Sequence, residues 1–169
     1  MLSCVTQARL ALRNPAPLEI GTPLSLVLNN FDPVPLRGAY PLLLAVERVA
    51  RIVPTGSGDA DAAFDLATVR YSYQITTRED AEVLAFHWTP DAASPPAVTY
   101  PHLHIGRALV AGQTALRLGD LHKARIPTGV IPLAAVIRMA ITEFGVTPLR
   151  PNWDQILRPA ENSQSAVAP

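Results

Sequence analysis

The sequence predicts an α+β fold, in which a curved antiparallel sheet of about four to six strands carries one main amphipathic helix over about residues 132–144. Several short segments alternate apolar and polar residues, as strands with one solvated face do. A later segment repeats its apolar residues at intervals of three and four, as a helix with one buried face does. The chain has 169 residues, and its 17 prolines and nine glycines divide it into short pieces, which favours strands over long helices.

The N-terminal half contains one clear strand pattern and two ambiguous segments. VTQARLALR, residues 5–13, alternates with period two and predicts a strand that the following NPAP ends. Residues 22–30 could form a helix that begins at Thr22 and Pro23, or a buried strand. Residues 40–53 leave the same alternatives open, although the β-branched residues near the end of this segment favour a strand.

A β-hairpin and a third strand are predicted for the middle of the chain. ATVRYSYQI, residues 67–75, and AEVLAFHWT, residues 81–89, both alternate, and a short polar turn joins them. AVTYPHLHIG, residues 97–106, is a further strand-like segment. Because proline cannot donate a ladder hydrogen bond, Pro101 predicts that this segment lies at a sheet edge or beside a bulge.

The C-terminal part predicts the helix and the end of the domain. In VIPLAAVIRMAITEFG the apolar positions share one side, with Pro132 near the start of the helix and Gly145 just after its end. One more helical turn is expected around Trp153. We therefore expect a single α+β domain over residues 1–159 and a disordered tail over residues 160–169.

Composition excludes several classes of protein. Fourteen basic and fourteen acidic residues give a net charge near zero, so no global basic field would hold nucleic acid. Cys4 is the only cysteine, which excludes a disulfide framework and a cysteine-based zinc site. The sequence shows no secretion signal, and its charge-free runs are shorter than the ~18 residues that a membrane-spanning helix needs. We expect a cytoplasmic protein without membrane insertion. The sequence leaves open whether the chain forms a homo-oligomer.

Two of the four histidines lie on the third strand-like segment. Side chains two residues apart in a strand point the same way, so Tyr100, His102 and His104 should share one face. Leu103 and Ile105 should then face the core. The histidine pair could be catalytic, could bind a metal ion, or could be a half-exposed polar face without chemistry.

A basic loop precedes the predicted helix and adds to this candidate site. Its sequence is LHKARIP, and backbone N–H groups at a helix N-terminus attract anions. Such a set would suit metal-independent phosphodiester chemistry, in which imidazole takes or gives a proton and Arg or Lys stabilises phosphoryl charge. The residues assigned on this hypothesis are catalytic His102, His104 and His122, and phosphate-binding Lys123, Arg125 and Arg107.

A metal site is the alternative use of these histidines. His102, His104 and His122 could ligate zinc or iron, with Asp120 as an additional carboxylate ligand. The spacing His-x-His permits such a site without being diagnostic of one.

Aromatic residues alternate on the hairpin and continue on the next segment. Tyr71, Tyr73 and Tyr100 could stack on the bases of a nucleic-acid substrate. Packing of the sheet against the helix explains the aromatic residues of the hairpin better. His87 lies on the strand face opposite Trp88 and is expected to be structural.

The segments YSYQI, LAFHW, PDAASPP and YPHLHIG, within residues 69–106, together resemble the small TumE-like toxins of prokaryotic toxin–antitoxin systems. The resemblance covers about a quarter of the chain and extends to Tyr71, Tyr73, His102 and His104. It implies a toxin-like component that acts on RNA or nucleotides and is neutralised by a protein partner such as an antitoxin. Leu103 stands where the family has a further histidine. A non-catalytic protein–protein interaction module is the alternative function.

Overall fold

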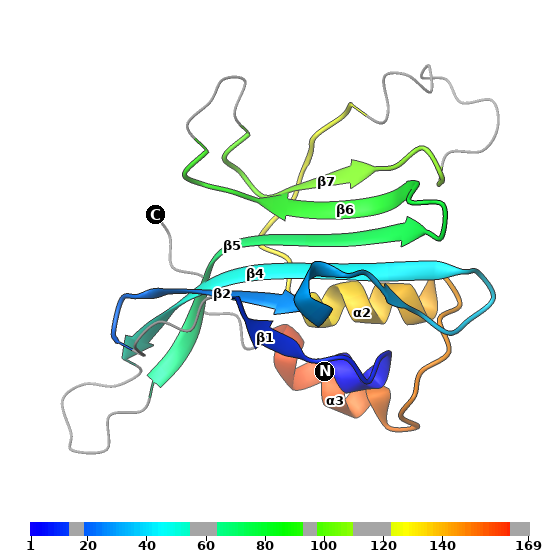
Figure 1. Cartoon of the computed structure of the whole chain (residues 1–169), viewed down its shortest axis with the longest axis horizontal. Helices are drawn as coiled ribbons and strands as arrows, with labels where there is room; N and C mark the ends of the chain where they lie inside the picture. Colours follow the sequence, from blue (N-terminus) through cyan, green and yellow to red (C-terminus); the bar gives the residue numbers. More distant parts are fainter. Residues whose placement is uncertain (14–18, 55–63, 93–97, 110–122, 163–169) are drawn as a thin grey trace.

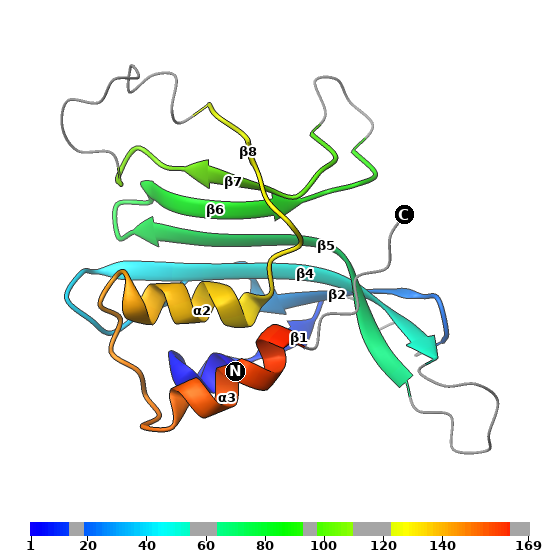
Figure 2. The same ribbon diagram turned by 180° about the vertical axis from the view of Figure 1, so that it is seen from behind.

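The computed structural model describes residues 1–13, 19–54, 64–92, 98–109 and 123–162. One antiparallel sheet of eight strands forms the first layer, and two helices lie on one of its faces (Figures 1 and 2). The elements are η1 (Leu2–Cys4), β1 (Leu10–Leu12), β2 (Pro23–Leu28), η2 (Asn29–Phe31), β3 (Val34–Pro35), β4 (Leu42–Pro54), β5 (Phe64–Thr77), β6 (Glu82–Trp88), β7 (His102–Ile105), β8 (Ile126–Pro127), α2 (Leu133–Thr142) and α3 (Trp153–Asn162).

The sheet has the order β1-β2-β4-β5-β6-β7-β8, and β3 pairs with β4 beside this path. Two long strands, β4 and β5, form its centre, and their register shifts between Val49 and Ala50. Such an irregularity bends a strand and increases its twist. The β5–β6 hairpin closes through a turn in which Asp80 has a φ of 60°, a conformation that aspartate tolerates better than most residues.

The hydrophobic core lies between the sheet and α2. Alternate residues of β5 and β6 enter it, including Tyr71, Tyr73 and Phe86, and the two tyrosine rings stack with centroids 4.6 Å apart. From α2, Leu133, Ala134, Val136, Ile137 and Ala140 are buried against the sheet. Full burial of one such aliphatic side chain larger than alanine contributes roughly 1.5–3 kcal/mol, so the buried face of α2 stabilises its packing on the sheet.

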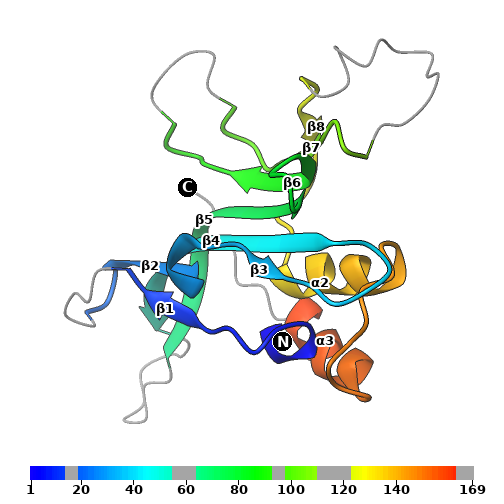
Figure 3. The same cartoon turned by 45° about the vertical axis from the view of Figure 1, so that its right-hand side comes forward.

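The N-terminal segment and α3 are both fixed within the helical layer. Figure 3 shows the N-terminal segment beside α3, and the backbone N–H of Leu149 donates to the Cys4 carbonyl at 2.7 Å. Arg138 of α2 forms ion pairs with Asp154 and Glu161 of α3. The Arg138 guanidinium also lies 5.3 Å from the centroid of the Trp153 ring, which adds a cation–π contact.

The predicted fold class is confirmed, but the sheet is larger than expected. Eight strands replace the predicted four to six, because β3 and β8 contain only two residues each, too few to show a period. The ambiguous segments 22–30 and 40–53 contain strands β2 and β4. The strand expected over residues 5–13 is confined to Leu10–Leu12.

The helical part also differs from the expectation in detail. The main helix spans Leu133–Thr142, and a second full helix, Trp153–Asn162, replaces the single turn expected around Trp153. This helix continues past residue 159, where the domain was expected to end, and residues 163–169 lie outside the described chain. Within the described residues, neither helix is long and apolar enough to cross a membrane.

Candidate metal centre

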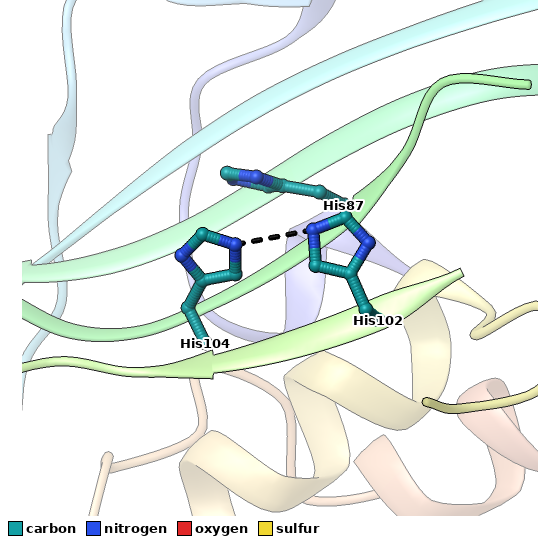
Figure 4. A group of neighbouring side chains, drawn as sticks. All are labelled: His87, His102 and His104. Carbon is teal, nitrogen blue, oxygen red and sulfur yellow. Dashed lines mark hydrogen bonds between the residues drawn. The ribbon is translucent and has the colours of Figure 1, made fainter. Parts of the chain in front are cut away.

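Three histidines from two neighbouring strands converge on the face of the sheet opposite α2. The pairing of β6 with β7 places His87 directly opposite His102, and Ala85 opposite His104. The alternate residues Phe86 and Leu103 pack in or against the core beside α2, so the three histidines point the other way. Figure 4 shows the three imidazoles directed toward one another.

The distances between the rings are those of a compact cluster. One nitrogen from each histidine can be chosen so that all three atoms lie within 4.8 Å of one another. The shortest separation joins Nε2 of His102 to Nε2 of His104 at 3.1 Å. The ring centroid of His87 lies 4.7 Å from that of His104 and 5.8 Å from that of His102. Side chains this close can share one small ligand.

Hydrogen bonding sets the tautomer of His102. Its Nδ1 lies 2.9 Å from the carbonyl oxygen of Tyr100, and a carbonyl can only accept, so Nδ1–H is the donor. The neutral ring therefore has an unprotonated Nε2, which faces His104. Without a ligand, Nε2–H of His104 donates to this nitrogen. The side chain of His102 is held in this position by burial, since only 5% of the residue is exposed.

The outer nitrogen of His104 faces a carboxylate. Nδ1 of His104 lies 4.0 Å from Oε1 of Glu82, the first residue of β6. Burial raises the pKa of the Glu82 carboxyl, and the nearby Arg125 opposes that shift. If His104 carries its proton on Nδ1, toward Glu82, its Nε2 becomes free to bind a metal ion.

Gly106 keeps Glu82 close to the histidines. A Cβ atom at this position would overlap the carbonyl oxygen of Glu82, so only glycine fits without moving the backbone. The N–H of Gly106 donates to the Val83 carbonyl at 2.9 Å, and that of Ala108 to the Glu82 carbonyl at 3.1 Å. The end of β7 is thereby held against the beginning of β6, where Glu82 lies.

Two of the imidazoles are held neutral by their surroundings. Burial, His102 and Arg125 lower the pKa of His87 from 6.5 to about 4. Burial, His87, Arg125 and His102 lower the pKa of His104 to about 4 as well. Both rings are therefore neutral imidazoles at neutral pH, with one nitrogen free of a proton, which is the state that binds a metal ion.

The structure brings together only part of the predicted site. His102, His104 and Tyr100 lie side by side, and the Tyr100 ring centroid is 5.8 Å from that of His102. The hydroxyl of Tyr100 donates to the Arg125 carbonyl at 3.5 Å. Arg125 is close enough to affect the pKa values of both His87 and His104.

Other predicted residues lie elsewhere or outside the described chain. Tyr71 and Tyr73 are each 1% exposed and pack in the core, so they do not present a stacking surface on this face. Lys123 and Arg107 are exposed, and Lys123 accepts a hydrogen bond from Arg125 through its carbonyl. His122 and Asp120 lie outside the described residues.

His87 is the member of the cluster that the sequence-based assignment missed. It was expected to be structural, but it supplies the third imidazole next to His102 and His104. The available signal was its position on the face opposite the core, which it shares with the histidine pair if β6 and β7 are neighbours. The register that places His87 opposite His102 could not be read from either segment alone.

Comparison of the chain with protein-family models, curated proteins and solved structures gives no match. The resemblance to TumE-like toxins therefore stays a prediction, and the functional argument depends on the geometry of the site.

Proposed function

We propose that this protein binds one divalent metal ion of the zinc type through His87, His102 and His104. The observation that carries the proposal is the 3.1 Å separation between Nε2 of His102 and Nε2 of His104. With Zn–N bonds of about 2.0–2.1 Å, two nitrogens of a tetrahedral zinc site lie about 3.3 Å apart. These two nitrogens thus already have nearly the spacing that a shared ion requires.

The surroundings of the two rings support the same assignment. The opposite nitrogen of His102 donates to a backbone carbonyl, and that of His104 faces a carboxylate. Metal-ligating histidines usually have such partners, which fix the tautomer and make the ligating nitrogen more basic. The third ring, His87, has the amide of Gln74 at 3.5 Å from its Nε2.

The composition of the cluster favours zinc over iron. Non-haem iron(II) oxygenases commonly use two histidines and one carboxylate, whereas three histidines are typical of catalytic zinc sites. Among the described residues, the three-member cluster that could hold an ion contains histidines alone. Three protein ligands would leave a fourth position for water or substrate, where the ion would act as a Lewis acid.

Metal-independent acid–base catalysis, the first function predicted from the sequence, has less support. A general acid or base works best with a pKa near the working pH, and the pKa values of His87 and His104 are about 4. Neither ring would be in the imidazolium form that donates a proton as a general acid at neutral pH. Action on RNA as a toxin, with an antitoxin partner, stays a prediction.

Metal binding is tested by titration of tag-free, metal-stripped protein with zinc in a calorimeter. We expect one ion per chain, with binding weakened at least 100-fold by His87→Ala, His102→Ala or His104→Ala. His122→Ala is the discriminating variant, because the sequence alone assigned His122 to the site. If His87→Ala keeps full affinity while His122→Ala loses it, the ligand set proposed from the structure is wrong.

A further inference from the structure

Arg125 occupies an unusual position for a residue beside a metal site. Strand β8 pairs with β7 so that Pro127 lies opposite His102 and Ile126 opposite Leu103. Continuing this antiparallel register by one residue places Arg125 next to His104. Two contacts fix the segment there, because Thr128 N–H donates to the Pro101 carbonyl at 2.9 Å and the Tyr100 hydroxyl donates to the Arg125 carbonyl.

The guanidinium has few partners in the described part of the chain. Its Nη1 donates to the Lys123 carbonyl at 2.9 Å, and it forms no ion pair with a carboxylate of the described residues. The side chain is exposed. An arginine has five N–H donors, so most of its donors are left for solvent or for a ligand.

The charges around the proposed metal ion indicate the charge that such a ligand must carry. Three neutral imidazoles leave the full double charge on a bound ion, and Arg125 adds a third positive charge close by. Glu82 is the one carboxylate near these groups that the structure describes, and it accounts for one negative charge at most. A cation next to a metal site opposes metal binding unless an anion lies between the two.

Resting on the proposed metal centre, we infer that the protein binds an oxyanion, a phosphate or carboxylate group, between the metal ion and Arg125. One oxygen of the anion would take the open coordination position of the ion. The other oxygens would accept hydrogen bonds from the guanidinium, whose planar fork matches both groups. Arg125 is thereby an anion-binding residue, and the substrate class is a small or polymeric molecule with an exposed phosphate or carboxylate.

The inference is tested with cobalt(II), whose visible absorption reports both occupancy and coordination. Tag-free protein is loaded with cobalt, and inorganic phosphate and acetate are titrated in separately. We expect a saturable spectral change with at least one of the two anions. Arg125→Ala should lower the affinity for that anion at least tenfold, because it removes charge-assisted hydrogen bonds. The anion that responds identifies the source of the oxyanion.

A second readout separates anion binding from a structural role. Without any anion, Arg125→Ala should bind cobalt more tightly than the natural protein, because a neighbouring positive charge is removed. Arg51→Ala is the matched control, since Arg51 is an exposed arginine near the far end of β4. This control should change neither the affinity for cobalt nor the affinity for the anion.

The outcomes distinguish the inference from the proposal beneath it. If cobalt binds but neither anion alters the spectrum, or Arg125→Ala leaves anion affinity unchanged, the oxyanion inference fails and the metal centre stands. If cobalt does not bind through the three histidines, the proposed function fails, and this inference fails with it.

Discussion

The β6–β7 ladder has four residue pairs, two on each face of the sheet, and the two faces carry different chemistry. On the helix side, Phe86 pairs with Leu103 and both contact the hydrophobic core. On the other side, His87 pairs with His102, and the centroids of their rings lie 5.8 Å apart. Because a strand alternates, stability and ligand binding can be assigned to adjacent residues and altered separately.

The largest expected effect is the loss of stability from the helix face. Phe86→Ala should lower the free energy of unfolding by about 3–5 kcal/mol, because it leaves a cavity in the core. The neighbouring variant His87→Ala should change the stability of the metal-free protein by at most about 1 kcal/mol. Urea unfolding monitored by circular dichroism measures both. Equal losses for the two variants would show that the faces are not energetically separate.

A smaller effect is expected on the histidine face, from the carboxylate behind His104. Glu82→Gln keeps the size of the side chain but removes the charge that would stabilise Nδ1–H of His104. We expect zinc affinity to fall about tenfold, while the free energy of unfolding of the metal-free protein changes little. Glu47→Gln is a suitable control, because Glu47 pairs with Arg70. Unchanged zinc affinity in Glu82→Gln would remove Glu82 from the site.

The histidine face is also expected to make stability depend on pH. The folded protein holds the pKa values of His87 and His104 at about 4, below the ordinary 6.5. Between these values the unfolded chain binds more protons, so stability is full above about pH 6.5 and is lost as the pH falls toward 4.

Thermal melting of the metal-free protein at pH 7 and pH 5 measures this loss. The double variant His87→Ala, His104→Ala should show a shallower decline in melting temperature than the natural protein. The raised pKa of Glu82 acts in the opposite direction, so Glu82→Gln should make the decline steeper. A decline of equal slope in all three proteins would show that the histidine face does not titrate as described.

How much could be predicted from the sequence differs between the fold and the site. Alternation within a segment predicted the hairpin and the shared face of His102 and His104, because period two is a local property. The position of His87 opposite His102 depends on the register between two strands separated by a loop. Arg125 reaches the site through β8, a two-residue strand with no readable pattern.

The shortness of β7 and β8 has a consequence for dynamics. The strand that carries two of the three proposed ligands has four residues, and its outer edge is covered by only two pairs with β8. Segments with few hydrogen bonds to neighbours open by local fluctuation far more often than the rest of a domain. An ion held between β6 and β7 would join the two strands, so entry and release of the proposed ion would be coupled to fraying of β7 while the central strands and α2 stay folded.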